Sequence, residues 1–430
     1  MRIVVKVCLA LLSCCSAMSM VVLAQGQSGR IHVPDSSIER PEDVGRRMHT
    51  NHLIFLRSGG GVTISSPSGE TPESLACVYK LVSNPVAGCP VKYTAPFNNP
   101  NGGLGTIAIV DAFDYPTAEN DLNVFSQKFG LPACTTAGGC FKKVYAKGVK
   151  PKANCGWAQE AALDIEWAHA MAPNATIVLV EAASNSYSDL FSAVDVAYNE
   201  VICGNTTCPA GGSGVGEVSM SWGGSESSSE ASYDSHFANT STKLAKPGVV
   251  FFAASGDSGG KVIYPSASPY VVSAGGTTVN RASGSFQSET AWSGSGGGPS
   301  KYEERPSYQD AIVTIVGSHR GTPDFSFDAN PSTGVSVYDS TSCQGLSGWL
   351  TFGGTSVSSP SLAGIVNLAE GGKSQSADTE LSTIYSNLGP DGLPNSNLRD
   401  ITSGTAGSFT AKAGWDFVTG VGSNQGTGGK

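Results

Sequence analysis

A serine at the start of a predicted helix is the residue of this sequence best placed to form a covalent intermediate. Ser356 lies in the octet GGTSVSSP at positions 353–360. Glycines let a backbone turn tightly and approach a ligand, and N–H groups at a helix N-terminus can bind an oxyanion. The octet therefore indicates a nucleophile, although an ordinary N-capping serine or threonine would give the same pattern.

A serine nucleophile needs a general base, and the sequence offers a pair of carboxylates. Glu160 and Asp164 are four residues apart in a helical segment, so their side chains share one face. Nearby Ala and Leu residues indicate partial burial, and one of two closely held carboxyls then has a raised pKa. His169 lies about 140° round the helix from Asp164 and cannot join that face. Glu166 also points elsewhere and is expected to be a surface charge.

A third carboxyl comes from another part of the chain. Asp257 follows a predicted buried strand and Ser255-Gly256, so it can reach across the ends of neighbouring strands. A turn aspartate before a glycine would look similar. The glycine-rich run at 293–298 lacks the motif and the context of a phosphate-binding loop, and we expect a flexible loop there.

The elements that must position these residues are short apolar strands alternating with helices. The sequence predicts strands at 106–111, 176–180, 218–222 and 249–253, and helices at 118–129, 156–171, 188–200 and 355–369. Such alternation favours a doubly wound α/β fold, a parallel sheet with helices on both faces. The functional site of such a sheet lies at the carboxyl ends of its strands, where Asp111, the segment Ser221-Trp222-Gly223 and Asp257 are expected.

The composition excludes several classes of protein. The chain has 430 residues with 26 Lys and Arg against 35 Asp and Glu, which gives a net charge of −9. An acidic chain without basic clusters does not bind nucleic acid through its charge, and 40% apolar residues exclude a disordered protein. Charged residues make up only 14% of the chain, which fits an acidic habitat.

The N-terminus indicates export. Arg2 and Lys6 precede an apolar stretch that ends near Ala24, as in a secretory signal peptide over residues 1–24. The alternative of a membrane anchor is disfavoured because the apolar stretch is shorter than the about 20 residues that a span needs. We therefore expect a secreted, extracellular protein that is not membrane-bound once the signal is removed.

Residues 25–70 are polar, contain Pro and Gly, and are interpreted as a short leader segment before a domain at 71–430. Eight cysteines follow the signal, an even number that favours disulfides in an exported chain. Their connectivity is left open by the sequence. Close pairs are Cys77/Cys89, Cys134/Cys140 and Cys203/Cys208, with Cys155 and Cys343 remaining.

Taken together, these segments resemble the sedolisin family of serine-carboxyl peptidases, which have a subtilisin-like fold. The resemblance covers roughly Thr71 to Gly422. It is carried by Glu160-x-x-x-Asp164, Ser221-Trp222-Gly223, Ser255-Gly256-Asp257, Gly354-Thr355-Ser356-x-x-x-Pro360 and the C-terminal Asp400-Ile401 with Gly414-Trp415-Asp416.

The resemblance implies a role for each catalytic residue. Ser356 would be the nucleophile, Glu160 its general base and Asp164 the carboxylate that supports Glu160. Asp257 would be the acid of the oxyanion hole. The segment Ser221-Trp222-Gly223 would be the edge that pairs with the substrate backbone.

The resemblance also implies one structural calcium ion. Its ligands would be the carboxylates of Asp400 and Asp416 with carbonyl oxygens of Ile401, Lys412 and Gly414. Oxygen-only ligands suit Ca²⁺. The sequence departs from the family at Lys412, where a glycine is usual, and at Gly353, where a serine is usual. The leader is also much shorter than the folded propeptide of most members.

These observations predict a secreted, monomeric endopeptidase that cleaves proteins or peptides through an acyl-enzyme on Ser356. Glu160 must be ionised and Asp257 protonated, and carboxyls with modest shifts meet both conditions at about pH 3–5. One alternative is a conventional Ser/His/Asp triad with Asp111 and His169. Another is an inactive peptidase scaffold that serves as a binding protein, a role that would require none of the four catalytic side chains.

Overall fold

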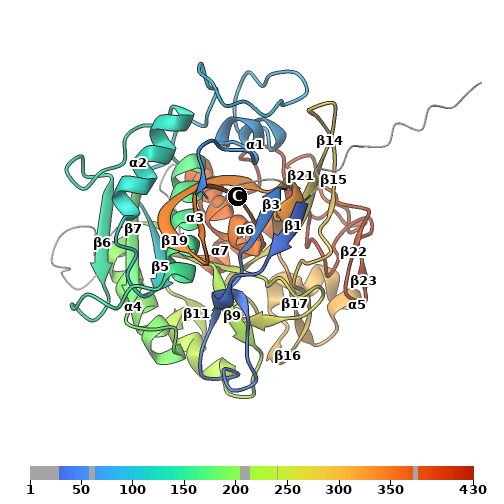
Figure 1. The fold of residues 1–430 in the computed structure, drawn as a ribbon. Coiled ribbons are helices and arrows are strands. Elements are labelled where there is room, and N and C mark those ends of the chain that lie inside the picture. Colours follow the sequence, from blue (N-terminus) through green and yellow to red (C-terminus); the bar gives the residue numbers. More distant parts are fainter. Residues whose placement is uncertain (1–28, 58–62, 204–213, 240, 371–375) are drawn as a thin grey trace, which may run out of the picture.

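A twisted, mainly parallel sheet forms the centre of the molecule. The computed structural model describes residues 29–57, 63–203, 214–239, 241–370 and 376–430 (Figure 1). The sheet has ten strands in the order β21-β24-β18-β14-β12-β8-β5-β7-β6, with β15 paired to β14. From β6 to β24 the neighbouring strands run parallel, which confirms the predicted doubly wound α/β class.

The strands of the central sheet match the apolar segments of the sequence. They are β5 (Thr106–Ala112), β6 (Phe141–Tyr145), β7 (Thr176–Ala182), β8 (Gly216–Met220), β12 (Val249–Ala254), β14 (Val272–Ala282), β15 (Ser285–Ala291), β18 (Phe325–Asp328), β21 (Leu398–Arg399) and β24 (Ser423–Asn424). The strand predicted at 218–222 is interrupted at Ser221. It continues as β9 (Trp222–Ser225), which leaves the central sheet and pairs with β2 (His49–Thr50) and β13 (Ile263–Tyr264).

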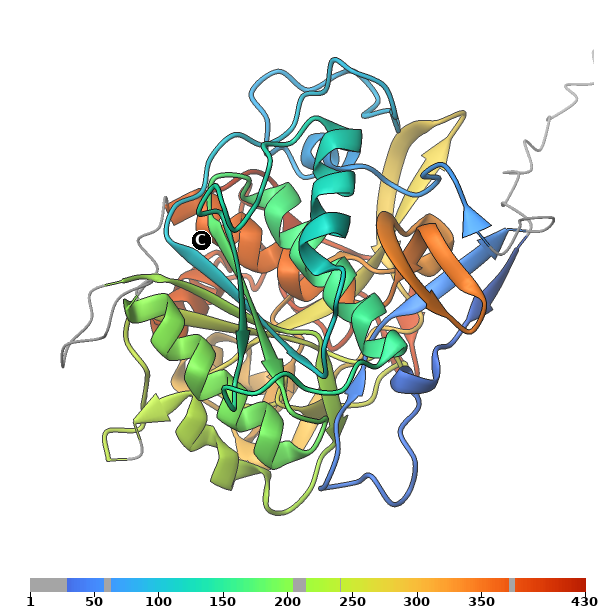
Figure 2. The same ribbon diagram turned by 60° about the vertical axis from the view of Figure 1, so that its left-hand side comes forward.

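Helices cover both faces of the sheet (Figures 1 and 2). On one face α3 (Cys155–Met171) packs against α6 (Thr355–Glu370) and α2 (Ala118–Phe129). On the other face α4 (Tyr187–Cys203) packs on β5, β7 and β8. The remaining helices are α1 (Pro72–Val78), α5 (Val313–Val316) and α7 (Ala377–Ser386). Among the described residues no helix is both long and apolar enough to cross a lipid bilayer.

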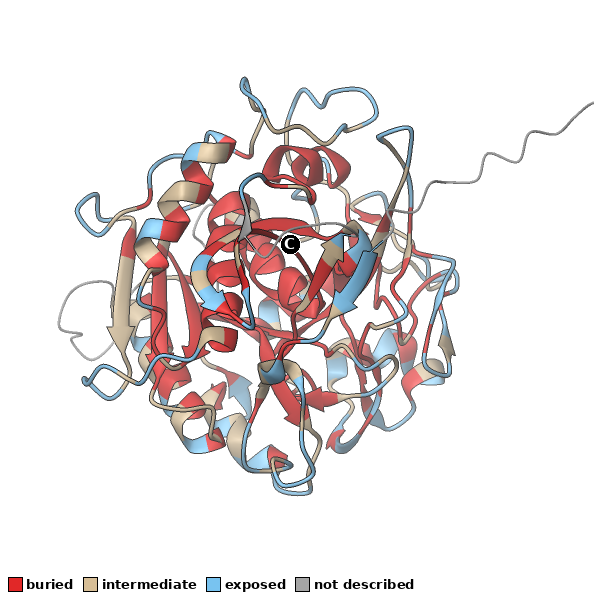
Figure 3. Cartoon of the chain, in the orientation of Figure 1, coloured by how far each residue is buried: buried red, intermediate tan, exposed pale blue. Residues whose placement is uncertain are grey.

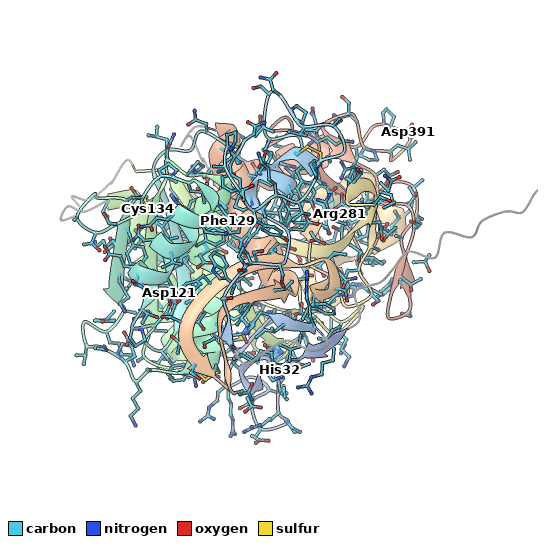
Figure 4. The ribbon with its side chains drawn as sticks, turned by 45° about the horizontal axis from the view of Figure 1, so that its top comes forward. His32, Asp121, Phe129, Cys134, Arg281 and Asp391 are labelled. Atoms are coloured by element: carbon cyan, nitrogen blue, oxygen red, sulfur yellow. A yellow bond between two sulfur atoms is a disulfide. The ribbon has the colours of Figure 1, made fainter. Side chains whose placement is uncertain are left out.

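A second sheet lies outside this layered core. It contains β1 (Gly29–His32), β3 (Leu53–Arg57), β4 (Thr63–Ile64), β19 (Val335–Cys343) and β20 (Leu346–Gly353). Smaller pairs are formed by β16 (Gly298–Glu304) with β17 (His319–Thr322), β10 (Ala238–Asn239) with β11 (Leu244–Ala245), and β22 (Thr405–Ala406) with β23 (Phe409–Thr410). Figure 4 shows Asp121 of α2 beside β19, where its carboxylate accepts hydrogen bonds from the N–H and hydroxyl of Ser340.

The helix that carries the predicted carboxylate pair is fixed at its N-terminus and buried on all sides. The side-chain oxygen of Asn154 caps α3 by accepting hydrogen bonds from the N–H groups of Gly156 and Trp157. Every residue from Gly156 to Met171 is buried, and Figure 3 shows α3 almost entirely in the colour of buried residues. A helix with apolar contacts all round lies inside the core rather than at its surface.

Two local expectations are wrong because this core is larger than the sequence indicated. Glu166 is fully buried instead of being a surface charge, and its Oε2 accepts a hydrogen bond of 3.0 Å from the N–H of Tyr338. The run at 293–298 is a packed segment: a Cβ at Gly296 would lie 1.9 Å from the carbonyl oxygen of Ser255. Glycine at this position lets the segment pack closely against the backbone that follows β12.

The predicted leader contributes the strands β1, β2 and β3, which pair with one another or with strands of the domain. Figure 1 shows β1 and β3 side by side in dark blue, next to the orange β19–β20 hairpin. Ile54 is buried in the largest hydrophobic cluster of the core, and Met48 is buried in the second largest. The signal peptide predicted at 1–24 lies outside the described residues.

Disulfides connect segments that are near and far in the sequence. Bonds join Cys77 to Cys89, Cys134 to Cys140, and Cys155 to Cys343. Cys203 is also disulfide-bonded, and Cys208 lies outside the described residues. The Cys155–Cys343 bond ties the first residue of α3 to the end of β19 across 188 positions.

Removal of the long-range bond should cost more stability than removal of a short one. In the chain-entropy model, closure of the 188-residue loop contributes about 5 kcal/mol, and closure of the 6-residue loop contributes about 2 kcal/mol. We expect the Cys155→Ser/Cys343→Ser double variant to lose more unfolding free energy in urea titrations than Cys134→Ser/Cys140→Ser. Equal losses would contradict the role given to the long-range bond.

Candidate active site

Ser356 lies at the centre of the site, in the first turn of α6. It is fully buried, and its hydroxyl donates a hydrogen bond of 3.1 Å to the carbonyl oxygen of Ser221. The Ser221 hydroxyl in turn donates to Asp164 Oδ1 at 2.8 Å and to the carbonyl oxygen of Ser356 at 3.3 Å. Ser221, at the interruption between β8 and β9, therefore joins the serine of α6 to the carboxylate of α3.

Glu160 lies on the same face of α3 as Asp164 and is also fully buried. Burial raises the pKa of this carboxyl well above its usual range, while the Ser356 hydroxyl and the N–H of Asn51 act in the opposite direction. Oε2 accepts the Asn51 N–H at 3.1 Å. Oε1 is buried and has no hydrogen-bond partner of normal geometry among the described residues. This oxygen is free to accept the Ser356 proton.

Asp164 and Asp111 extend the acidic cluster away from the serine. Burial and then the charge of Glu160 raise the pKa of Asp164 well above its usual range, and the hydrogen bond from Ser221 lowers it. Asp111, on β5, is fully buried, and its pKa is raised by burial and by the charges of Asp164 and Glu160. Three buried carboxyls so close together cannot all ionise readily.

Asp257 is held against the residue that precedes Ser356. Its Oδ1 accepts hydrogen bonds from the N–H of Thr355 at 2.8 Å and from the Thr355 hydroxyl at 2.9 Å. Burial raises the pKa of Asp257 to about 8, against the effect of these two bonds. Its Oδ2 is buried and has no hydrogen-bond partner in the described part of the chain. A protonated Oδ2 could donate a hydrogen bond to an oxyanion.

A segment of the leader crosses this site. β2 pairs antiparallel with β9, with His49 opposite Gly223 and Thr50 opposite Trp222. The N–H of Asn51 donates to the carbonyl oxygen of Ser221 at 3.1 Å. The edge Ser221-Trp222-Gly223, predicted to pair with substrate backbone, thus pairs in this structure with the chain's own N-terminal segment. The Trp222 indole is buried and donates to the carbonyl oxygen of Val110 at 2.7 Å.

Sequence reasoning missed His52, which was assigned to the leader. Its Nδ1 lies 3.0 Å from Glu160 Oε2, and its ring stacks on Phe352. Burial lowers the pKa of His52 to about 3, so the imidazole is neutral through most of the pH range. A polar residue three positions before the buried Phe55 gave no local signal, because only the fold brings 52 to 160.

The conventional triad is not assembled. His169 is buried away from the site, and its Nε2 is 2.9 Å from the carbonyl oxygen of Pro132. Asp111 faces carboxyls instead of an imidazole. Because the Glu160 carboxyl is the group next to Ser356, a carboxylate occupies the place that a histidine base would take.

The two carboxylates among the predicted calcium ligands both accept hydrogen bonds from the backbone at 412–414. Asp400 Oδ2 accepts the N–H of Gly414 at 3.1 Å, and Asp416 Oδ2 accepts the N–H of Lys412 at 3.0 Å. Ile401 is buried beside them in a small hydrophobic cluster. Asp400 Oδ1 is buried without a hydrogen-bond partner among the described residues. Two carboxylates at this segment, one of them with an unsatisfied oxygen, fit a cation that prefers oxygen ligands.

Comparison with known proteins agrees with this geometry. No family model matches the chain. Kumamolisin of Bacillus sp. (strain MN-32) is 32% identical over 292 residues, which cover 61% of this chain and 49% of that protein. Sedolisin of Pseudomonas sp. (strain 101) is 29% identical over 256 residues, covering 53% of this chain and 41% of that protein. The chain is therefore similar to members of the sedolisin family over 53–61% of its own length.

The sedolisin fold extends over most of the described structure. Pseudomonas sedolisin, solved in complex with two molecules of pseudo-iodotyrostatin, superposes with a TM-score of 0.63 at 22% identity. The match covers 84% of this chain and 96% of that one. This likeness confirms the predicted subtilisin-like fold. The chain spans about half the length of the curated sedolisin relatives it matches.

The buried carboxyls of this protein should make the fold more stable in acid. The pKa of Asp257 is about 8 in the folded chain, against 3.8 for an unperturbed aspartate. The folded state therefore keeps a proton that the unfolded state loses above about pH 4, so stability falls as pH rises towards 8. One such group contributes a slope of up to about 1.4 kcal/mol per pH unit.

Asp257→Asn, which cannot ionise, should flatten this pH dependence by about one proton. Urea unfolding at pH 4–8 in a Ser356→Ala background measures the slope without self-digestion. Asp391→Asn is the matched control, since Asp391 is exposed at the rim of the molecule (Figure 4). An unchanged slope in the Asp257 variant would mean that this carboxyl is ionised in the folded chain.

Proposed function

We propose that this protein is a serine-carboxyl endopeptidase that hydrolyses peptide bonds of proteins or peptides in acid. The observation that carries the proposal is the contact of Ser356 with the buried Glu160, whose neighbour Asp164 is linked to Ser356 through the Ser221 hydroxyl. The Ser356 hydroxyl and the N–H of Asn51 both donate to the carbonyl oxygen of Ser221. The adjacent Glu160 would be the base. The named relatives kumamolisin and sedolisin support this reaction class.

The reaction would have two halves, formation of the acyl-enzyme and its hydrolysis, and the same side chains would act in both. Glu160 removes the proton of the Ser356 hydroxyl as its Oγ attacks the peptide carbonyl carbon, and Asp164 supports the charge of the pair through Ser221. Glu160 then returns the proton to the leaving amine, which departs and leaves an ester on Ser356. A water molecule, deprotonated by Glu160, hydrolyses the ester and regenerates the hydroxyl.

The oxyanion formed in both steps lies where two donors converge. The N–H of Ser356 is one of them, and protonated Asp257 is the other. Removal of an oxyanion donor from an enzyme site typically costs a factor of about 10²–10³ in kcat. The high pKa of Asp257 keeps this donor protonated throughout the acid range.

The pH window follows from these two carboxyls. Glu160 must be ionised and Asp257 protonated, so activity rises with the ionisation of Glu160 and falls with that of Asp257. Entry of water into the site with a substrate would reduce the desolvation that raises the pKa of both carboxyls, and so would favour ionised Glu160. The optimum is therefore in acid, below the neutral range that a histidine base would favour.

Hydrolysis of casein from pH 2 to 9 tests this proposal. We expect an optimum in acid, no turnover by Ser356→Ala, and a loss of at least about 100-fold in kcat for Glu160→Gln, because the base is absent. Asp257→Asn should lose much of the rate but keep its remaining activity at high pH, since the amide donates at every pH.

Other outcomes have defined meanings. A neutral optimum that still needs Ser356 would favour a histidine base. A folded protein without activity at any pH would favour an inactive scaffold that binds peptides at the β9 edge. Residual turnover by a pure Ser356→Ala sample would rule out this serine as the nucleophile.

The proposal extends to location and organisation. The predicted signal peptide at 1–24 supports secretion, and the disulfides are typical of exported chains. We propose a monomer with a domain from 71 to 430 that includes the whole catalytic set. No nucleic-acid or membrane partner is proposed for the mature chain.

We also propose one structural calcium ion at the 400–416 turn. Asp400 and Asp416 would supply carboxylates, and Ile401, Lys412 and Gly414 would supply carbonyl oxygens. A lysine carbonyl is as good a ligand as a glycine carbonyl, so the departure at Lys412 does not remove a ligand atom. The ion would neutralise the half-buried Asp400 and the buried Asp416 and hold the C-terminal segment against β18.

Chelation should lower the thermal stability of the protein. With EGTA we expect a decrease in Tm of several degrees that added Ca²⁺ reverses, because ligand binding to the folded state contributes to stability. Asp400→Asn should lower Tm without EGTA and abolish the further effect of the chelator. Asp391→Asn, on an exposed turn, is the control and should respond like the unmodified protein. A Tm that is indifferent to EGTA would remove calcium from the proposal.

A further inference from the structure

A disulfide and a buried imidazole meet at the end of α3 that is remote from the catalytic carboxyls. Cys134 lies in the loop after α2 (Figure 4), and Cys140 directly precedes β6. The two sulfur atoms and a ring nitrogen of His169 all lie within 4.8 Å of one another. Within the described part of the chain, no other set of three or more His, Cys, Asp or Glu side chains brings its ligand atoms so close.

The imidazole of His169 has hydrogen-bonding capacity that the fold leaves unused. Nε2 is 2.9 Å from the carbonyl oxygen of Pro132. Nδ1 is buried and has no hydrogen-bond partner among the described residues, and the residue as a whole is fully buried. A histidine that ligates a metal usually directs its second ring nitrogen to a carboxylate or a backbone carbonyl, which fixes its tautomer and orientation. Pro132 provides such a carbonyl for His169.

The loop between the two cysteines is held by hydrogen bonds that do not involve the disulfide. The carbonyl oxygen of Thr135 accepts the N–H of Cys140 at 3.1 Å. Glu119 of α2 accepts the N–H and the hydroxyl of Thr136 at 2.9 and 2.8 Å. The carbonyl oxygen of Cys140 accepts the N–H of Ile177 on β7 at 2.7 Å. Reduction of the S–S bond would therefore leave both sulfur atoms close to the imidazole.

This group of side chains is accessible from one direction and separate from the catalytic residues. Residues 136–139 are exposed and Cys140 is half-buried, so a small thiol or a metal ion can reach Cys140 from the loop. His169 is nine positions beyond Glu160 on α3, which corresponds to about 13 Å along the helix axis. A metal bound here would not contact the reacting groups of the proposed peptidase.

We infer that Cys134, Cys140 and His169 form a redox-gated zinc site. In the reduced chain, two thiolates and one imidazole nitrogen bind Zn²⁺, and a water molecule completes the tetrahedron. Sulfur and nitrogen ligands suit Zn²⁺, whereas Ca²⁺ and Mg²⁺ prefer oxygen. The disulfide is the oxidised, metal-free state of the same side chains. The inference goes beyond the proposed peptidase function and does not depend on it.

A small thiol–disulfide couple is the co-reactant that converts one state into the other. A dithiol gives two electrons and two protons to the Cys134–Cys140 bond, which opens to two thiols, and the dithiol becomes a disulfide. Zn²⁺ then displaces the two thiol protons into solvent. In the opposite direction a small disulfide takes two electrons from the thiolates and two protons from solvent. The protein S–S bond forms again and Zn²⁺ is released.

Co²⁺ is the probe, because its thiolate charge-transfer and tetrahedral d–d absorption bands report the ligands directly. The Ser356→Ala chain, chosen to avoid self-digestion, is treated with just enough phosphine to open the Cys134–Cys140 bond and is titrated with Co²⁺ at pH 7.5 without oxygen. Alkylation and mass spectrometry identify the reduced cysteines. We expect one equivalent of Co²⁺ to bind the reduced chain with these bands, no bands in the oxidised chain, and displacement of Co²⁺ by Zn²⁺.

Variants assign the ligands. Cys134→Ser/Cys140→Ser should lose the bands, whereas Cys77→Ser/Cys89→Ser, which removes a second local disulfide, is the matched control and should keep them. His169→Asn should bind Co²⁺ at least about tenfold more weakly, because the imidazole ligand is lost. If the His169 variant does not fold, X-ray absorption of the zinc-loaded reduced chain tests for an imidazole at about 2.0 Å beside two sulfurs at about 2.3 Å.

Several results would overturn the inference. Equal bands in Cys134→Ser/Cys140→Ser would show adventitious binding by other groups. Unchanged affinity in a folded His169→Asn chain would remove the histidine, and a reduced chain that binds no Co²⁺ would remove the site. A bond that resists reduction in the folded chain, or a fold lost when this bond alone is opened, would remove the redox gate. Casein hydrolysis by the oxidised protein tests the proposed function separately, because no step of that reaction uses these residues.

Discussion

The removal of carboxyl groups from water is the constraint on which this structure depends. Glu160 and Asp164 lie one helical turn apart on a helix that is buried on all sides, with Asp111 buried and Asp257 half-buried near them. An isolated carboxylate in such a place is costly, so each group either keeps its proton or accepts hydrogen bonds. The same burial that makes these groups unfavourable for a neutral-pH fold keeps the proton on Asp257, as the proposed reaction requires.

The surrounding elements can be understood as the means of holding those groups. Asn154 and the Cys155–Cys343 bond fix the start of α3, and the interruption at Ser221 brings a hydroxyl between Asp164 and Ser356. The packed glycines at 293–298 bring the backbone of another segment up against the strand end that carries Asp257. Rigid support of this kind positions reacting groups more accurately than loops do.

Most of the fold was predictable because its signals are local. The strand at β5, and α2 with its end at Gly130, follow from hydrophobic periodicity and chain-terminating residues within a dozen positions. The four catalytic candidates were found because spacing on a helix and turn chemistry are also local, and their assigned roles remain predictions. The burial of Glu166, the role of Thr355 in holding Asp257 and the contact of His52 with Glu160 depend on segments about 100 or more positions apart. No window of sequence contains that information.

The β9 edge pairs with the N-terminal segment through main-chain N–H and C=O groups at alternating residues. Main-chain pairing of this kind depends little on the side chains of the bound segment, but it requires an extended backbone with unpaired N–H and C=O groups. A folded protein has few extended stretches with unpaired amides to offer, and denaturation is what supplies them. Under the proposed function the edge would therefore select unfolded chain, and a peptide with N-methylated amides would not bind it whatever its side chains.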